Sequence, residues 1–203
     1  LRGFDSELGL GLQDSMEKKG ISLKFSESVS SIKGNIGNLK ITTNLGSFIE
    51  SEGLLFAVGR QPLLNDLRLD LAKVFVEKNR IKVDKKNKTN VSNVFAIGDV
   101  TDRLNLTPVA VDEGRAFADR TFSSSKRIVN YENVPCAVFS QPEIATVGMT
   151  EELAVEKLGK ENIKIYRSRF KPLSKSLPKT GSSCLLKLVV EANTEKILGC
   201  HMI

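Results

Sequence analysis

Val94-Phe95-Ala96-Ile97-Gly98-Asp99 is the most informative segment of this chain. Four apolar residues followed by a glycine and an acid predict a buried strand that ends where the backbone passes close to a ligand. The Asp99 carboxylate is able to accept hydrogen bonds from the hydroxyls of a ribityl or ribose chain. By itself the segment is also typical of a strand that runs into an ordinary turn, so the surrounding sequence must decide.

Two further motifs accompany this segment: Ala57-Val58-Gly59-Arg60-Gln61-Pro62 precedes it and Leu106-Thr107-Pro108-Val109-Ala110 follows it. In this order the three motifs resemble those of the pyridine nucleotide-disulfide oxidoreductase family of flavoproteins, and the resemblance covers essentially the whole chain. It is greatest to the branch that reduces glutathione disulfide. It implies that the chain is a fragment, which matches the second half or so of such an enzyme and stops short of its end.

The composition narrows the possible classes of protein. The 203 residues, 40% of them hydrophobic, are enough for one large domain or two small ones. No run of about 18 apolar residues is present, so no membrane helix is predicted. Three widely spaced cysteines and one histidine argue against a disulfide framework or a metal centre and favour a reducing compartment. The net charge of +6 comes from basic residues spread among 24 acids, which does not indicate a nucleic-acid partner.

Apolar periodicity and turn residues predict the order of the elements. Helices are expected over residues 5–19, 108–122 and 150–158. Strands are expected over residues 22–25, 28–33, 39–43, 47–50, 54–58, 80–83, 94–97, 137–140, 144–147, 163–170, 184–191 and 197–203, and a turn at Ser182-Ser183.

The family resemblance implies three parts, with α/β structure followed by α+β structure. Residues 1–62 would be the end of an NADPH-binding domain, and residues 63–132 the second segment of an FAD-binding domain. Residues 133–203 would be an incomplete dimerisation domain, α+β in class, with an antiparallel sheet. The implied cofactors are therefore FAD and NADPH.

Two arginines are implied to contact NADPH. Arg2 lies in the family pattern Leu-Arg-x-Phe-Asp, whose arginine is one of a pair that grips the adenosine 2′-phosphate. A guanidinium suits this task because its donors form a planar fork that matches a phosphate. Arg60 resembles a residue that lies along the NADPH site, although an arginine at a domain hinge can also serve structure alone.

The residues implied to contact FAD come from the other two motifs. Gly98 and Asp99 resemble the motif whose acid hydrogen-bonds the ribityl or pyrophosphate part of FAD. Leu106, Thr107 and Pro108 resemble the segment that enters a helix beneath the isoalloxazine ring. The free N–H groups and positive dipole end of such a helix would stabilise the negative charge of a reduced flavin.

The implied activity is the reduction of glutathione disulfide to glutathione with NADPH, by a cytoplasmic homodimer. Arg115 resembles the arginine that contacts a carboxylate of glutathione disulfide, and its alternative is a solvated surface residue. The family's redox pair Cys-x4-Cys and its terminal His-Pro are missing from the sequence, so no residue is assigned to catalysis and the chain alone is expected to be inactive. Four reactive-looking residues are instead predicted to be structural: Cys136, Cys184, Cys200 and His201.

Other interpretations stay open. Within the family, the alternatives are a trypanothione, mercuric or dihydrolipoamide enzyme, although the last usually lacks Leu-Thr-Pro-Val-Ala after the flavin acid. Outside enzymes, the chain could be a non-catalytic dimerisation module, which would dimerise without a cofactor. A basic nucleic-acid binder is a third class, and it would show salt-sensitive retention on DNA or RNA.

Overall fold

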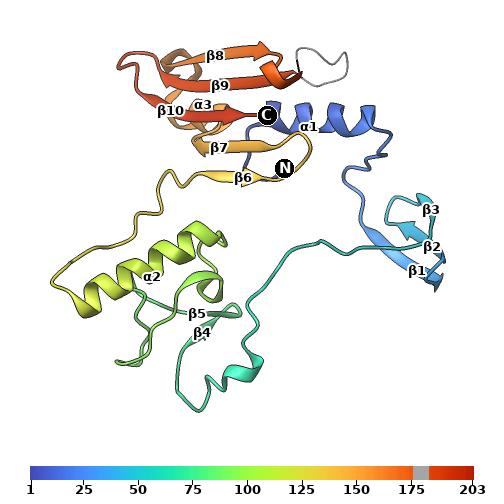
Figure 1. Ribbon diagram of the computed structural model, residues 1–203. Coiled ribbons are helices and arrows are strands. Elements are labelled where there is room, and N and C mark those ends of the chain that lie inside the picture. Colours follow the sequence, from blue (N-terminus) through green and yellow to red (C-terminus); the bar gives the residue numbers. More distant parts are fainter. Residues whose placement is uncertain (176–182) are drawn as a thin grey trace. The chain divides into compact units, whose positions relative to one another are not determined.

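The computed structural model of the chain describes residues 1–175 and 183–203, so Ser182 of the predicted turn lies outside the described residues. The chain forms two compact units, one made of residues 1–15 and 61–203 and the other of residues 16–60 (Figure 1). Helix α1 (Ser6–Lys18) begins in the first unit and ends in the second. Among the described residues, no helix is long and apolar enough to cross a membrane.

The second unit contains a small antiparallel sheet with the order β1-β2-β3. Its strands are β1 (Val29–Asn35), β2 (Asn38–Thr43) and β3 (Phe48–Ser51), which confirms three of the strands predicted here. Alternate residues of β2 are buried, as expected for a strand with one covered face. The strand predicted over residues 22–25 is wrong, because that segment pairs with none of these strands.

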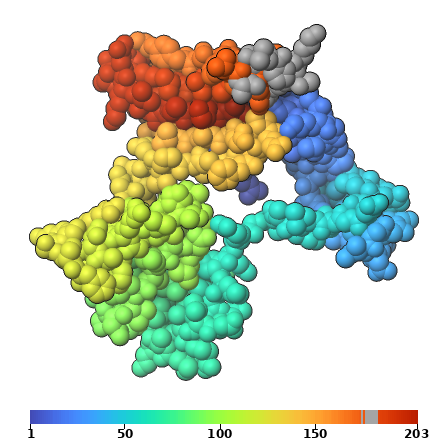
Figure 2. All heavy atoms as spheres, viewed as in Figure 1, coloured from blue at the N-terminus to red at the C-terminus, as the bar shows by residue number. Residues whose placement is uncertain are grey.

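The strand predicted over residues 54–58 is also wrong. This segment is extended and unpaired, and it exposes 87% of Leu55 and 90% of Val58. Figure 2 shows it, in turquoise, as a narrow run of atoms with little cover. A strand is stabilised by a neighbour that pairs with its backbone groups, and no strand in the described part of the chain supplies one.

The C-terminal part of the first unit is an antiparallel sheet whose described strands have the order β6-β7-β10-β9-β8. Their bounds are Cys136–Val138 for β6, Ile144–Gly148 for β7, Ile163–Phe170 for β8, Cys184–Glu191 for β9 and Ile197–Met202 for β10. Helix α3 (Glu151–Leu158) begins after Thr150, whose hydroxyl accepts a hydrogen bond from the Leu153 N–H as an N-cap. Two short 3-10 turns, Lys160–Asn162 and Leu173–Lys175, flank β8. The predictions for this part are confirmed to within a few residues.

Helix α1 packs against one end of this sheet. Leu8 of α1 is fully buried against Ile144, Leu185 and Ile203 of the sheet region, and Phe4 and Leu12 pack around the same core. The N-terminal helix therefore shares a hydrophobic core with residues more than 130 positions later in the chain, since Leu8 packs with Ile144.

The middle part of the first unit surrounds a second hydrophobic core, centred on Leu64, Val74, Ile81 and Ala96. Its elements are a 3-10 turn at Asn65–Leu67, strands β4 (Val76–Glu77) and β5 (Arg80–Ile81), a 3-10 turn η2 (Gly98–Thr101) and helix α2 (Thr107–Phe122). Helix α2 confirms the helix predicted over residues 108–122.

The buried strand predicted over residues 94–97 is not present. The segment makes one β-bridge, between Lys88 and Phe95, and 39% of Phe95 and 38% of Ile97 are exposed. The Phe95 ring instead packs against Phe117 of α2, with 4.9 Å between the ring centroids. The apolar run is extended as predicted, but a single bridge does not make a ladder.

An ion cluster fastens the start of α1 to the sheet. The Lys187 ammonium, only 1% exposed, lies 2.8 Å from Asp5, 2.8 Å from Glu7 and 2.7 Å from Glu151. Arg167 bridges two of the same acids, at 2.8 Å from Glu7 and 2.7 Å from Glu151. Asp5 is fully buried and also accepts hydrogen bonds from the N–H groups of Glu7 and Glu151. The buried Lys187 ammonium is thus paired with three acids, which is the condition for burying a lysine.

The carboxylates around α1 predict a loss of stability in acid. Burial would raise the pKa of Glu152, but hydrogen bonds from Ser6, Thr150 and the backbone outweigh it and lower this pKa from 4.5 to about 2. A lowered pKa contributes stability that is present above pH 4.5 and is lost as the pH falls toward 2. We expect the Ser6→Ala variant to lose stability at a higher pH than the wild type, when urea unfolding is followed by circular dichroism between pH 6 and pH 2.

Ser15→Ala is the control for this experiment, because Ser15 lies later in α1 and its hydroxyl donates to the Gly11 carbonyl. Its acid profile should match that of the wild type. Equal profiles for all three proteins would show that Ser6 does not set the pKa of Glu152.

Candidate functional site

The Gly98-Asp99 turn is pressed against the first turn of α2. Gly98 has a φ of +70°, in the left-handed region that favours glycine, and a Cβ built there would lie 3.1 Å from the Ala110 Cβ. Both constraints favour glycine at this position. The following residue, Asp99, is exposed, so its carboxylate is accessible beside the start of the helix.

The N-terminus of α2 has the features of an anion-binding helix end. Leu106 precedes the helix in an extended conformation and provides no side-chain cap, and Pro108 lies in the first turn. Thr107 and Pro108 are exposed, while Val109 is buried and anchors the helix. The first N–H groups of such a helix have no intrahelical partner, and the dipole favours negative charge there.

A buried acid, missed by the sequence analysis, supports this turn from behind. Glu113 is 1% exposed, and its carboxylate accepts hydrogen bonds from the Gly98 N–H and the Tyr131 hydroxyl, both at 2.5 Å. Arg103 lies 4.0 Å from Glu113 and donates to the Tyr131 hydroxyl at 2.9 Å. One signal could have indicated the burial: Glu113 follows Val109 by four residues, on the apolar face of α2.

The structure brings together five of the residues implied to bind cofactor: Gly98, Asp99, Leu106, Thr107 and Pro108. Arg115 is exposed farther along α2, next to Gly114, where an added Cβ would lie 3.4 Å from Ile97.

The two arginines implied to bind NADPH lie in other segments. Arg2 is exposed just before the anchored Asp5, at the start of the chain. Arg60 is exposed at the end of the second unit. Arg2 therefore belongs to the first unit and Arg60 to the second.

The residues predicted to be structural lie in the C-terminal sheet region. His201 is fully buried, with its Nδ1 2.5 Å from the Thr146 hydroxyl and its Nε2 2.9 Å from the Met149 carbonyl. The bond to a carbonyl requires a proton on Nε2, so this nitrogen is the donor to Met149. The three cysteines are free thiols and half-buried.

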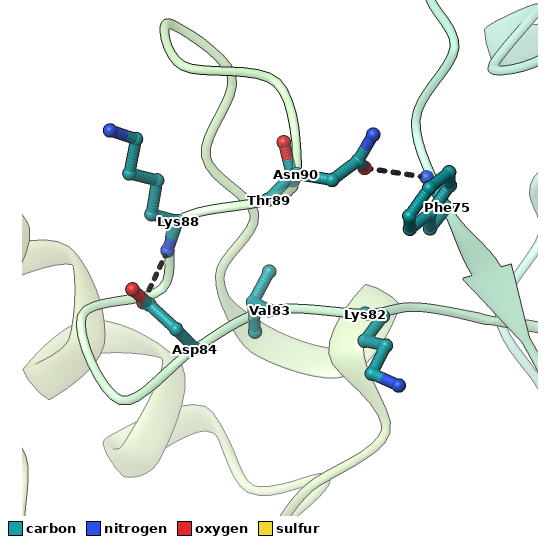
Figure 3. Close-up of a pocket in the computed structure, with 7 residues that line it drawn as sticks. All are labelled: Phe75, Lys82, Val83, Asp84, Lys88, Thr89 and Asn90. Carbon is teal, nitrogen blue, oxygen red and sulfur yellow. Dashed lines mark hydrogen bonds between the residues drawn. The ribbon is translucent and has the colours of Figure 1, made fainter.

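A separate open pocket of about 310 Å³ lies over the β4–β5 region (Figure 3). Neither Gly98 nor Asp99 lines it. Its polar walls are occupied by internal contacts: Asn90 accepts from the Phe75 N–H, Asp84 accepts from the Lys88 N–H, and Lys82 pairs with a neighbouring glutamate at 3.1 Å. These contacts are those of a packed loop, so we centre the candidate site on the Gly98-Asp99 turn instead.

Comparison with known proteins defines the class. Residues 1–114 match the family described as pyridine nucleotide-disulphide oxidoreductase, and residues 134–203 match the dimerisation domain of that family. The chain therefore belongs to the pyridine nucleotide-disulphide oxidoreductase family, as its motifs indicated.

Several relatives carry the same name. The whole chain is 39% identical over 204 residues to glutathione reductase from Burkholderia cepacia, covering 45% of that protein. It is 40% identical over 204 residues to the chloroplastic/mitochondrial glutathione reductase of Pisum sativum, covering 37% of it. The chain thus spans less than half the length of these curated relatives.

A solved structure shares the fold. The HOCl-induced flavoprotein disulfide reductase RclA from Escherichia coli superposes with a TM-score of 0.87 and 27% identity, over 97% of this chain and 45% of its own. The mixed helix and sheet architecture with antiparallel sheets is therefore shared with the matching part of that protein.

Proposed function

We propose that this chain is part of an FAD-dependent enzyme that reduces glutathione disulfide to glutathione with NADPH. The observation that carries the proposal is the Gly98-Asp99 turn packed on the open N-terminus of α2, in a chain whose relatives at 39% identity are named glutathione reductases. The domain limits implied by the family, residues 1–62, 63–132 and 133–203, are part of this proposal, as are a cytoplasmic location and a homodimer formed through the last part.

The residues of the turn fit a flavin cofactor. The exposed Asp99 carboxylate would accept hydrogen bonds from ribityl or ribose hydroxyls, and Gly98 lets the backbone approach a bulky ligand. The free N–H groups around Thr107 would face negative charge on the ring, in a site prepared before the ligand binds. When bound, the flavin supplies the route by which electrons pass from NADPH to a disulfide.

The arginines would select the other two ligands. Arg2 would bind the 2′-phosphate that distinguishes NADPH from NADH, and the ion cluster at Asp5 fixes the backbone three residues later. Arg60 would lie along the same nucleotide. Arg115, exposed on α2, would pair with a carboxylate of glutathione disulfide.

A different disulfide substrate is the second candidate, because RclA has the same fold and is named a disulfide reductase without mention of glutathione. The higher identity to glutathione reductases, 39% against 27%, favours the first.

A chimera tests the proposal, in which the 203 residues replace the matching part of the Burkholderia cepacia glutathione reductase. We expect a yellow protein that oxidises NADPH only when glutathione disulfide is present. Arg2→Leu should raise KM for NADPH and leave KM for NADH unchanged, and the control Arg169→Leu, at an exposed position on β8, should change neither.

A folded chimera without flavin would contradict the proposal. A flavin-bearing chimera that reduces another disulfide, but not glutathione disulfide, would support the second candidate. The chain by itself is expected to form no thiol from glutathione disulfide and NADPH, since it has no redox cysteine pair.

A further inference from the structure

Glu113 is buried against the Gly98-Asp99 turn, which is unusual for a glutamate. A carboxylate is rarely buried unless its charge is matched by donors. Glu113 is 1% exposed, and its two oxygens accept from the Gly98 N–H and the Tyr131 hydroxyl, with the Arg103 guanidinium 4.0 Å away. All three neighbours are hydrogen-bond donors, so the Glu113 carboxyl group is surrounded by groups that match an acceptor.

Gly98 is restrained at both of its backbone polar groups. Its N–H donates to Glu113 at 2.5 Å, and its carbonyl accepts from the Thr101 hydroxyl at 2.9 Å. The side of the turn that faces α2 lies against Ala110. Because the N–H, the carbonyl and the Cα of Gly98 are all held in place, the backbone position of Asp99 is fixed as well. The point from which the Asp99 side chain extends is therefore also fixed.

Tyr131 connects this restraint to a distant part of the chain. It lies in the segment after α2, three positions before the dimerisation-domain match begins at residue 134. Its hydroxyl donates to Glu113 and accepts from Arg103, whose guanidinium lies 5.5 Å from the centre of the tyrosine ring. Arg103 also donates to the carbonyls of Val83 and Asp84, at 3.1 and 2.5 Å.

The Tyr131 hydroxyl stays protonated at neutral pH, so it can donate to Glu113 throughout that range. Burial raises the pKa of Tyr131, and the hydrogen bond to Glu113 raises it further, while Arg103 works in the opposite direction. The raised pKa keeps the hydroxyl protonated at neutral pH, because tyrosine titrates near pH 10 without perturbation.

We infer that Glu113 and Tyr131 are positioning residues for the flavin, and that Tyr131 makes flavin affinity depend on the segment leading to the dimerisation domain. The inference rests on the proposed function, because it assigns the ligand of the turn to be FAD. Neither residue contacts the ligand: Glu113 acts through the Gly98 N–H, and Tyr131 acts by holding the Glu113 carboxylate.

Two measurements test the inference. The first is amide exchange of Gly98 by NMR in the full 203-residue chain, which we expect to be fast in E113A and protected in the wild type. The second is FAD retention by the chimera described above. We expect E113A to weaken FAD binding by about tenfold and Y131F by about threefold, since each loses hydrogen bonds that act on the turn and not on the ligand.

The variants separate positioning from general stability. In E113Q the amide oxygen of the glutamine can still accept from the Gly98 N–H. The protection of the Gly98 amide against exchange and the affinity for FAD should therefore stay within about threefold of the wild type. Should E113A fail to fold, Y131F decides, because it removes one hydroxyl and keeps the ring. Matched controls are E156Q, exposed on α3, and Y166F, 53% exposed on β8, which should change neither measurement.

The possible failures are distinguishable. A wild-type chimera that binds no FAD would overturn the proposed function, and this inference with it. A wild type that binds FAD no more tightly than E113A and Y131F overturns the inference alone, as does a Gly98 amide that stays equally protected in both variants.

Discussion

Replacing Lys187 with methionine is expected to lower the free energy of unfolding of the chain by about 3–5 kcal/mol. Methionine fills nearly the same space, so the expected loss is electrostatic and not a cavity. Without the ammonium, the buried Asp5 and the partly buried Glu7 and Glu151 lose their common partner, and Arg167 reaches only two of these acids. Urea unfolding followed by circular dichroism measures the change.

Lys164→Met provides the control for Lys187. Lys164 is exposed on the neighbouring strand β8, and its loss should change the free energy of unfolding by no more than about 0.5 kcal/mol. A second variant, with Asp5→Asn added to Lys187→Met, should recover part of the loss, because one unmatched charge is then removed. If Lys187→Met costs as little as Lys164→Met, the cluster does not anchor α1.

Changing Asp99 to asparagine is expected to weaken FAD binding by about 10–100-fold, the effect of turning a charge-assisted hydrogen bond into a neutral one or losing it. The amide has almost the same shape, and the turn is fixed at Gly98, so the fold should persist. The wild-type and variant chimeras would be compared by equilibrium dialysis against FAD and by their absorption spectra.

Asp102→Asn is the matched control, because Asp102 is exposed three residues later and its carboxylate accepts from Asn105 instead. Its affinity for FAD should equal that of the wild type. If Asp99→Asn and Asp102→Asn hold FAD equally well, the Asp99 carboxylate does not contact the flavin nucleotide.

The elements that the sequence predicted correctly are those with strong local signals. Helix α1 ends in basic residues followed by Gly20, and α3 begins at a threonine whose hydroxyl caps it. The strands of the C-terminal sheet find their partners within the same 70 residues matched by the dimerisation domain, from 134 to 203. In this part the apolar pattern predicts strands and the neighbouring strands that pair with them are present, so the prediction matches the structure.

Two of the three wrong strands share one physical cause. The segments 54–58 and 94–97 have the apolar runs of buried strands, yet the described chain offers them no ladder to join. An apolar run indicates that a segment favours burial. Whether it forms a strand depends on a second segment that pairs with it, and the local sequence does not contain that information.

The candidate site was predictable only in part. The family motifs pointed to Gly98 and Asp99, and the structure places them beside the start of α2. Glu113 was given no role, because burial of this acid depends on Tyr131, which lies 18 residues later, and on Arg103 before the helix. Polar networks of this kind combine distant residues and leave little trace in any one stretch of sequence.

The ion cluster around Lys187 also constrains how sequences with this fold can diverge. Its three acids and two bases come from four separated places in the chain: Asp5 and Glu7, Glu151, Arg167, and Lys187. A single substitution leaves a charge unmatched, so evolutionary drift at one position is costly until another position compensates. The five positions are therefore expected to covary or to stay fixed, because all of them depend on the charge of the buried Lys187 ammonium.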